Sequence, residues 1–355
     1  MSHVAHLAAH LEPGEALLIT APHNRRYLTG FPSSAGCVVI TGDYACFLTD
    51  FRYIEAAQKA VTTMDCRMYK RLSETLKDLF TQHAITRVVV ETSTMPLAEV
   101  NRWQELLPDV EWVGDGSLDD WLREERLIKT PREVACIRQA QALTEYGFDH
   151  IVKVIRPGLT EREIALELEF YIRKQGAERV AFDFIVVSGA NSALPHGVPT
   201  DKVVETGDFV TMDFGAVVDG WHSDMTRTVA VGQASDEQRL IYDTVLHAQR
   251  AALAALCEGL SCQEGDAAAR DIIAAAGYGE AFGHSTGHGV GVEIHEAPNL
   301  SPSVSEERLK AGSVVTVEPG IYLPGRFGVR IEDMALITPD GCQDLTASPK
   351  ELLVL

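Results

Sequence analysis

The sequence predicts two domains, a small α/β domain followed by a larger α+β domain built from a duplicated unit. Between residues 16 and 116, short apolar runs alternate with helix-like segments, which is typical of a sheet covered by helices. Residues 115–130 are strongly charged and helical, as expected of a boundary. The motif GDFVTMDFG, from residue 207, recurs as GSVVTVEPG from residue 312. We therefore expect domains at residues 1–122 and 123–355.

Composition describes an ordinary globular protein that is long enough for two cores, with 355 residues and 46% hydrophobic side chains. The formal charge of -20 disfavours nonspecific nucleic-acid binding and attachment to an anionic membrane, because both need basic surface. The seven cysteines form no CxxC pair, which fits reduced thiols. Because the first residues lack a basic region leading into a long apolar run, we expect a cytoplasmic protein.

The first domain is predicted to contain six strands and three helices. A hairpin turn is expected at Gly42-Asp43, between two of the strands. No GxGxxG or GxxxxGK motif is present, so a nucleotide-binding role has little support. The strands are expected at residues 16–20, 36–41, 44–50, 67–69, 87–91 and 110–114, and the helices from residue 52, near 73–83 and near 96–107.

The second domain is predicted to open with two long helices. Thr130 can cap the first of them, because Pro131 suits the first turn and Glu133 stands where a capping box requires it. Thr160 and Glu163 repeat this arrangement after a proline and a glycine. We expect helices at about 131–155 and 160–175, and helical structure again at about 236–275 before the second copy of the motif.

The two copies of the motif place acids at matching positions. Asp213 in the first copy corresponds to Glu318 in the second, and each acid lies inside an apolar run. Each copy then turns and returns to a further acid, Asp224 or Glu332. The matched pairs are Gly207 with Gly312, Thr211 with Thr316, Asp213 with Glu318, and Gly215 with Gly320.

Hairpin geometry indicates that these acids can meet. Asp213 lies opposite Asp224 if the first turn centres between residues 218 and 219, and Glu318 lies opposite Glu332 if the second centres on residue 325. Opposed Cβ atoms are about 4.5–5.5 Å apart, which suits carboxylates around metal ions about 3.5–4 Å apart. The alternative is that the acids occupy the wet face of each hairpin, but a buried acid without a partner is costly.

Residues 283–296, GHSTGHGVGVEIHE, place three histidines among glycines. Such a loop can simply be solvated, but imidazoles near glycine-freed backbone also suit a metal or substrate site. Two divalent cations would neutralise the four carboxylates, with His288 completing the ligand set. This carboxylate-rich set favours manganese, with cobalt or zinc as alternatives, and a metal pair of this kind hydrolyses amides.

The motifs TMDFGA, SDMTRT, HSTGHGVGVEIHE, TVEPGIY and GVRIEDM occur in this order and together resemble the M24 metallopeptidase family. The small preceding domain and the LPHG segment are most similar to its aminopeptidase P and prolidase branch. The resemblance implies a duplicated pita-bread fold in the second domain. It also implies a two-metal site in which Asp213 binds one ion, Asp224 and Glu332 bridge both, and His288 and Glu318 bind the other.

The resemblance also implies the residues that act on substrate. These would be His196, His284 and His295, which line the site and stabilise the reacting carbonyl. Glu318 would also shuttle protons, and Arg330 would support the site electrostatically. The substrate would carry an Xaa-Pro bond at its N-terminus, whose nitrogen has no N–H and whose ring needs a dedicated pocket. We also expect a homodimer.

One position departs from the family pattern. Proline dipeptidases of this family commonly carry an arginine four residues after the second site histidine, where Asn299 stands here. Arg25, Arg26 or Arg52 could hold the substrate carboxylate instead. We therefore favour an Xaa-Pro dipeptidase slightly over an Xaa-Pro aminopeptidase acting on longer peptides.

Three other classes within this fold remain as alternatives. Metal-free creatine hydrolases and noncatalytic pita-bread binding proteins have lost ligand residues, whereas all five ligand positions are filled here. Methionine aminopeptidases usually lack the preceding α/β domain.

Overall fold

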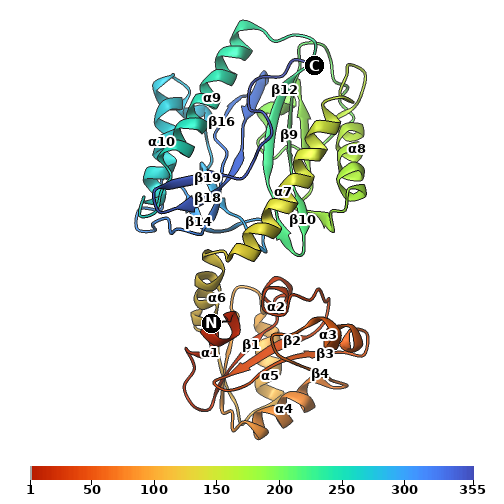
Figure 1. Cartoon of the computed structure of the whole chain (residues 1–355), viewed down its shortest axis with the longest axis vertical. Coiled ribbons are helices and arrows are strands. Elements are labelled where there is room, and N and C mark those ends of the chain that lie inside the picture. Colours follow the sequence, from red (N-terminus) through yellow and green to blue (C-terminus); the bar gives the residue numbers. More distant parts are fainter. Residues whose placement is uncertain (1) are drawn as a thin grey trace. The chain divides into compact units, whose positions relative to one another are not determined.

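The computed structural model describes residues 2–355 and divides the chain into two compact units, Met1–Arg126 and Leu127–Leu355 (Figure 1). The boundary expected between residues 122 and 123 lies inside α6 (Ser117–Leu127). Leu118 and Leu122, one helical turn apart, are both buried, so the helix has no reason to break at that boundary.

The first unit is a mixed six-stranded sheet with helices, in the strand order β4-β3-β2-β1-β5-β6. Its central strand β1 pairs antiparallel with β2 and parallel with β5. The strands are β1 (Glu15–Ile19), β2 (Cys37–Thr41), β3 (Ala45–Thr49), β4 (Asp65–Met68), β5 (Arg87–Val90) and β6 (Glu111–Val113). The helices before α6 are α1 (His3–Ala8), α2 (Pro22–Thr29), α3 (Ile54–Ala60), α4 (Leu72–Gln82) and α5 (Leu97–Leu106).

Each strand and helix expected in this unit is present, and the β2–β3 hairpin turns where it was predicted to turn. The helices α1 and α2 were missed. The sequence of α2, PHNRRYLT, has no apolar repeat, because the helix buries polar side chains such as Asn24 and Arg25. Its sequence signals are only Pro22 in the first turn and Gly30 after the last turn. Gly30 has φ 67°, as a helix C-terminus often requires.

The second unit contains the duplication. Its first half runs through α7 (Pro131–Ile151), α8 (Glu161–Lys174), β7 (Arg179–Val180), β8 (Ile185–Ser188), η1 (Gly189–Ala193), β9 (Phe209–Phe214), β10 (Ala216–Val218), β11 (Trp221–His222) and β12 (Met225–Ala230). Its second half runs through α9 (Asp236–Ala255), α10 (Cys262–Ala275), η2 (Gly279–Ala281), β13 (Gly287–Gly289), β14 (Glu296–Leu300), β15 (Val314–Val317), β16 (Gly320–Leu323), β17 (Phe327–Arg330), β18 (Asp333–Thr338) and β19 (Gly341–Asp344).

Each half places a pair of helices before an antiparallel hairpin. In the first half β9 lies between β8 and β12, and in the second β15 lies between β13 and β18. The helices α7 and α8 pack on strands of the first half, and α9 and α10 on strands of the second, so the two helix pairs enclose the strands (Figure 1). This is the duplicated pita-bread architecture, and the fold prediction is confirmed.

The helix caps explain where these helices begin. Both predicted capping boxes are present, from Thr130 to Glu133 and from Thr160 to Glu163. The helical stretch expected at 236–275 is instead two helices, α9 and α10. Leu256 is extended and Gly259 has φ 82°, so the chain turns before Ser261 caps the next helix.

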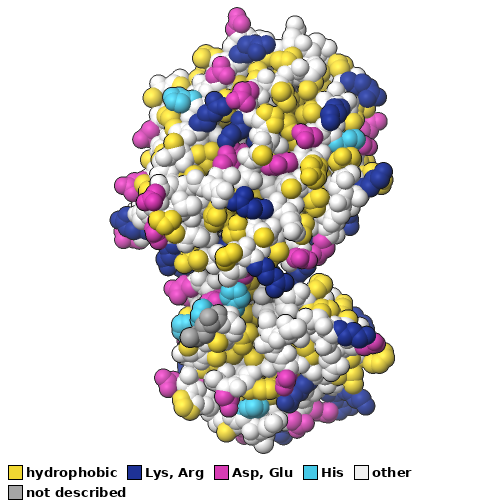
Figure 2. Space-filling view, viewed as in Figure 1, with side chains coloured by type: hydrophobic (Ala, Val, Ile, Leu, Met, Phe, Trp, Pro, Cys, Tyr) yellow, Lys and Arg dark blue, Asp and Glu magenta, His cyan; other side chains and the backbone are white. Residues whose placement is uncertain are grey.

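The core of the second unit follows the duplication. One buried cluster includes Ile164, Leu168 and Phe214 from the first half, and another is mostly from the second half. On the face drawn in Figure 2, acidic and basic side chains are interspersed between apolar ones. Among the described residues, every helix is too short or too polar to traverse a lipid bilayer.

The capping box at Thr160 can be tested directly. Thr160→Ala removes the hydroxyl that accepts from the Glu163 N–H, and we expect the free energy of unfolding to fall by about 1 kcal/mol. Thr160→Ser keeps the hydroxyl and should cost clearly less. Denaturant titrations of the three proteins measure this difference, and equal losses in both variants would contradict the assigned cap.

Candidate metal centre

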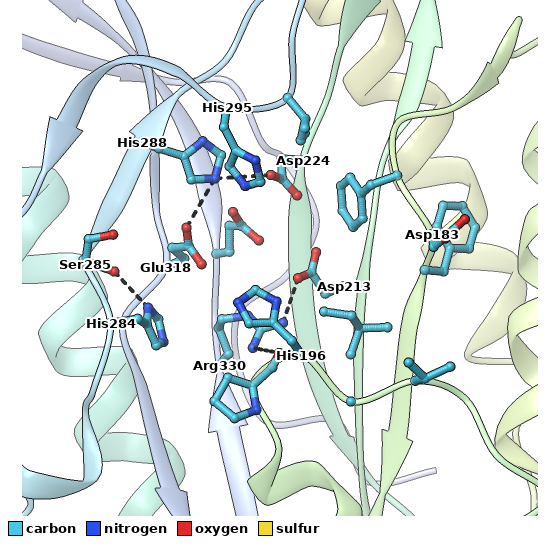
Figure 3. Close-up of a pocket in the computed structure, with 18 of the residues that line it drawn as sticks. Asp183, His196, Asp213, Asp224, His284, Ser285, His288, His295, Glu318 and Arg330 are labelled. Carbon is cyan, nitrogen blue, oxygen red and sulfur yellow. Dashed lines mark hydrogen bonds and ion pairs between the residues drawn. The ribbon is translucent and has the colours of Figure 1, made fainter. Parts of the chain in front are cut away.

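The second unit contains a cavity of about 780 Å³ between the two hairpins (Figure 3). One wall is polar and the other is mostly apolar. The polar wall contains Asp213, Asp224, His284, His288, His295, Glu318, Arg330 and Glu332, and the apolar wall includes Phe182, Phe184, Ile185, Pro195, Val198, Pro199 and Ile294. The cavity therefore contains every site residue that the sequence predicted in this unit, including His196.

The first hairpin brings Asp213 and Asp224 to one face, but in a register that differs from the predicted one. Asp213 pairs with Thr226, and not with Asp224. Asp219 and Gly220 both have positive φ, as a two-residue type I′ turn requires, so the turn centres one residue later than expected. This moves the partner of Asp213 by two positions. Because side chains alternate, Asp224 stays on the same face as a diagonal neighbour.

The second hairpin has the predicted register. Val317 pairs with Asp333, and Gly320 pairs with Arg330, on either side of Gly325. Glu318 and Glu332 therefore face one another at the junction of the two ladders, and this prediction is confirmed. Acids reach the cavity from both hairpins because an apolar stretch of each hairpin contains one, Asp213 in the first and Glu318 in the second.

His288 comes from β13, which lies very close to β15. A Cβ on Gly287 would lie 1.9 Å from the carbonyl oxygen of Thr316, so only glycine fits before this histidine. The backbone N–H of His288 donates to Thr316 Oγ1 at 3.0 Å. Its ring Nδ1 lies 3.0 Å from the Gly289 carbonyl oxygen and must donate to it, which leaves Nε2 as a free acceptor.

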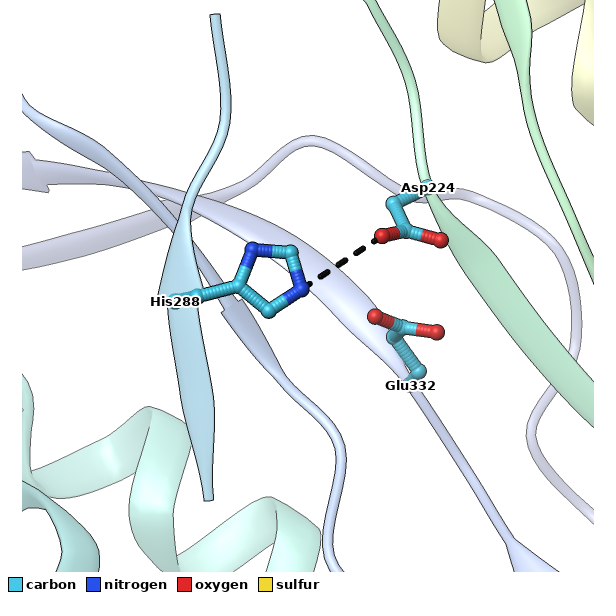
Figure 4. A group of neighbouring side chains, drawn as sticks. All are labelled: Asp224, His288 and Glu332. Atoms are coloured by element: carbon cyan, nitrogen blue, oxygen red, sulfur yellow. Dashed lines mark ion pairs between the residues drawn. The ribbon is translucent and has the colours of Figure 1, made fainter. Parts of the chain in front are cut away.

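Three of the five predicted ligands form the closest group. One potential ligand atom from each of Asp224, His288 and Glu332 lies within 4.8 Å of the others (Figure 4). His288 Nε2 is 3.6 Å from Asp224 Oδ2 and 3.4 Å from Glu318 Oε1. The fifth residue, Asp213, accepts a 2.7 Å hydrogen bond from Arg330 Nη2 through Oδ2.

The electrostatics fit a cation at this place. Burial, reinforced by the neighbouring carboxylates, raises the pKa of Asp224 and Glu332 well above the ordinary range, and burial raises the pKa of Glu318 to about 8. Burial also lowers the pKa of His288 to about 4, which keeps the imidazole neutral and able to bind a metal.

Unsatisfied oxygens support the same interpretation. Among the described residues, Oδ1 of Asp213 and Oδ1 of Asp224 are buried and accept no hydrogen bond from the protein. Buried acceptors usually have a partner, so these two oxygens suit a cation or its bound water. Four carboxylates and one neutral imidazole form a donor set that a pair of divalent cations would satisfy.

A chain of hydrogen bonds connects Asp213 to His284 through two further side chains. Arg330 Nη1 donates to Tyr322 Oη at 3.0 Å, and Tyr322 Oη lies 2.9 Å from His284 Nε2. His284 Nδ1 must donate to the Ser285 carbonyl oxygen 2.8 Å away, so Nε2 accepts from Tyr322. Burial lowers the pKa of His284 to about 4, in agreement with a neutral ring.

This series of hydrogen bonds changes the expected role of His284. Both of its ring nitrogens have protein partners, so it lines the cavity without offering a free N–H to substrate. Tyr322 was missed in the sequence, although it follows the acid of TVEPGIY by four residues. Thr226 was also missed; its hydroxyl donates to Glu332 Oε2 at 2.7 Å and accepts from Arg330 Nε at 3.0 Å.

His196 and His295 are the histidines that remain accessible. His196 lies on the loop after η1, and His295 lies on the segment before β14 with its ring centroid 4.4 Å from that of His288 (Figure 3). Asn299 also lines the cavity. The loop after η1 and the segment around β14 therefore meet at this cavity, which the family resemblance implied and which hydrophobic periodicity alone does not predict.

The arginines proposed for the substrate carboxylate belong to the first unit. Arg25 is buried and donates to the carbonyl oxygens of Thr20 and Ser33, so its guanidinium is already bound. Arg52 is exposed and pairs with Asp50 at 2.6 Å. Among the described residues that line the cavity, Arg330 is the one arginine or lysine.

Two family models match the chain. Residues 135–339 match the model described as metallopeptidase family M24, and residues 12–127 match the creatinase/prolidase N-terminal domain. An Xaa-Pro dipeptidase from Pyrococcus horikoshii is 38% identical over 341 residues, which cover 96% of this chain and 94% of the relative.

Solved structures named for each of the two Xaa-Pro activities resemble the chain. An Xaa-Pro dipeptidase from Bacillus anthracis is 43% identical and has a TM-score of 0.95, with 99% of each chain covered. An X-Pro aminopeptidase from Thermotoga maritima is 38% identical with a TM-score of 0.93, covering 98% of this chain and 100% of the other.

Metal removal should lower the stability of the second unit. We expect protein stripped of metal by a chelator to gain about 2.7 kcal/mol in its free energy of unfolding when a divalent ion is added at about 100 times its dissociation constant. The reason is that only the folded site binds the ion. Thermal unfolding with and without Mn²⁺ measures this gain. Asp224→Asn should lose most of it, whereas Asp201→Asn, an exposed acid paired with Arg162, should keep it. An equal gain in both variants would place the ions elsewhere.

Proposed function

The chain belongs to metallopeptidase family M24, and on that premise we propose that it hydrolyses Xaa-Pro dipeptides. The observation that carries the proposal is the meeting of four acids from two duplicated hairpins with one neutral imidazole, beside an apolar wall. A metal-dependent peptidase needs the group of acids and imidazole, and selection for proline uses the apolar wall.

We assign two divalent ions to the five predicted ligands. Asp213 would hold one ion, His288 and Glu318 the other, and Asp224 and Glu332 would bridge both. We expect manganese, with cobalt or zinc as alternatives, because oxygen ligands dominate the set. When bound, the two metal ions would activate a water molecule and polarise the scissile carbonyl.

The side chains around the ligands then orient and protect the reaction. Arg330 fixes Asp213 through Nη2, and it is itself held by Tyr322 and by the Pro195 carbonyl oxygen, so its role is positioning. We assign His295 and His196 to the substrate, as accessible imidazoles that can donate to its carbonyl oxygens. Glu318 would accept and return a proton at a carboxylate oxygen during turnover.

The apolar wall suits the proline ring. Phe182, Phe184 and Ile294 line the cavity beside the ligand group. An Xaa-Pro bond has no N–H on its nitrogen, so a peptidase for it can dispense with an acceptor there and needs apolar room instead. We propose that these side chains hold the ring.

The second candidate is an Xaa-Pro aminopeptidase. Asn299 and the shortage of cations on the cavity wall favour it, because a dipeptide presents a carboxylate beside its proline. The expectation of a noncatalytic binding protein has less support, since all five ligand positions carry ligand residues. Cytoplasmic residence and a homodimer remain predictions.

Replacing His295 tests its assignment to substrate. We expect His295→Ala to lower kcat by roughly 10²-fold, the scale for losing one donor to a developing oxyanion. Metal content, measured by elemental analysis, should stay near that of the wild type. Loss of metal from this variant would instead make His295 a ligand.

Substrate length separates the two candidate activities. With Ala-Pro and Ala-Pro-Ala at equal metal loading, we expect the larger kcat/KM for the dipeptide. A dipeptidase needs a charged donor for this carboxylate beyond the described cavity lining, and such a pairing would be worth roughly 1.5–3 kcal/mol, which is more than tenfold in kcat/KM. A preference for the tripeptide would favour the aminopeptidase.

A further inference from the structure

His295 lies in a segment without helix or strand, residues 290–295, between β13 and β14. The ladder between these strands is irregular, because the register shifts between His288 and Gly289. Regular backbone pairing therefore does not fix where the His295 ring points. A substrate residue needs such fixing, since a displacement of about 1 Å can cost roughly 10²-fold in rate.

One end of this segment is held by His222. The backbone N–H of His222 donates to the Gly291 carbonyl oxygen at 2.9 Å, and its ring Nδ1 lies 3.1 Å from the same oxygen. His222 is buried and stands two residues before the ligand Asp224. The beginning of the segment is thus tied to the first hairpin.

The other end is held by the carboxylate of Glu296, which folds back over the segment. Its Oε1 accepts from the backbone N–H of Glu293 at 3.0 Å. A Cβ built on Gly291 would lie 2.3 Å from Glu296 Oε2, so the carboxylate occupies the place where another residue would carry its side chain. The carboxylate therefore packs directly on the backbone that carries His295.

Lys129 neutralises this carboxylate inside the protein. Its Nζ donates to Glu296 Oε2 at 3.2 Å, and the side chains of Lys129 and Glu296 are 0% and 3% exposed. Lys129 is fixed in turn, because its backbone N–H donates to the Gly312 carbonyl oxygen at 2.8 Å and Thr130 caps α7 beside it. Glu296 also lines the cavity, so without its cation the carboxylate would turn toward water there, and the segment would move with it.

We propose that Lys129 is a positioning residue for His295, acting through the buried ion pair with Glu296 and the segment that this carboxylate holds. The inference rests on the proposed role of His295 at the substrate. Lys129 itself does not line the cavity, and its effect is on catalysis rather than on metal binding.

The test is a double-mutant cycle on the metal-loaded, full-length enzyme with Ala-Pro as substrate. Lys129→Met removes the ammonium and keeps much of the side-chain volume, and His295→Ala removes the imidazole. We expect Lys129→Met alone to lower kcat roughly 10- to 100-fold, with metal content unchanged. In the His295→Ala background the same change should lower kcat less than twofold, because the misplaced group is already absent.

Two further variants control for general damage. Lys129→Arg keeps a positive charge and should recover part of the lost kcat. Lys202→Met removes another ion-pairing lysine, whose Nζ lies 2.7 Å from Asp208 Oδ2. Neither residue lines the cavity, so this variant should keep kcat within twofold of the wild type. If Lys129→Met does not fold, Glu296→Gln replaces it in the cycle, since the amide keeps the shape and removes the charge.

The outcomes separate the inference from the function on which it rests. The positioning role is overturned if Lys129→Met leaves kcat unchanged, or if it lowers kcat by the same factor with and without His295. Either result leaves the assignment of His295 to substrate intact. Loss of metal in Lys129→Met also overturns it. If His295→Ala turns over at the wild-type rate, the assignment of His295 to substrate fails first and the inference fails with it.

Discussion

The structure of the second unit depends on keeping like charges close together in a largely buried place. Four carboxylates from two hairpins converge there, and burial, reinforced by neighbouring acids, raises the pKa values of three of them, Asp224, Glu318 and Glu332. Such a cluster persists only if rigid elements hold each acid and if cations compensate the charge. Paired strands supply the rigidity, and bound metal ions would supply most of the charge.

The protein adds its own cations behind the acids. Arg227 is fully buried, and it donates to the carbonyl oxygens of Thr226 and Glu332 and to Asp333 at 2.7 Å. It also donates to the carbonyl oxygens of residues 348 and 349, so the C-terminal segment is tied to the backbone of Glu332, between β17 and β18. Arg227 holds the backbone of the ligand strands, whereas Arg330 holds a ligand side chain.

Local signals in the sequence were sufficient for much of the fold. The threonine and glutamate of each capping box marked α7 and α8 because both bonds of the box are made within four residues. The helix α2 was missed because its burial depends on polar contacts that leave no apolar period. The first hairpin was placed two positions out of register because either of two adjacent turn centres was compatible with Asp219-Gly220, and only backbone φ values decide between them.

The repeat predicted the acids of the candidate site, and the pairing across each hairpin shows where its two copies differ. Asp224 stands opposite Gly215 in the first hairpin, and Arg330 pairs with Gly320 in the second, so a cation replaces an acid at matching positions. Likewise Thr226 pairs with Asp213 where the second hairpin sets Glu332 against Glu318.

These substituted positions bond across the two halves. Arg330 of the second hairpin binds Asp213 of the first, and Thr226 of the first donates to Glu332 of the second. The positions at which the two hairpins differ therefore supply a guanidinium and a hydroxyl, and each binds an acid of the opposite half.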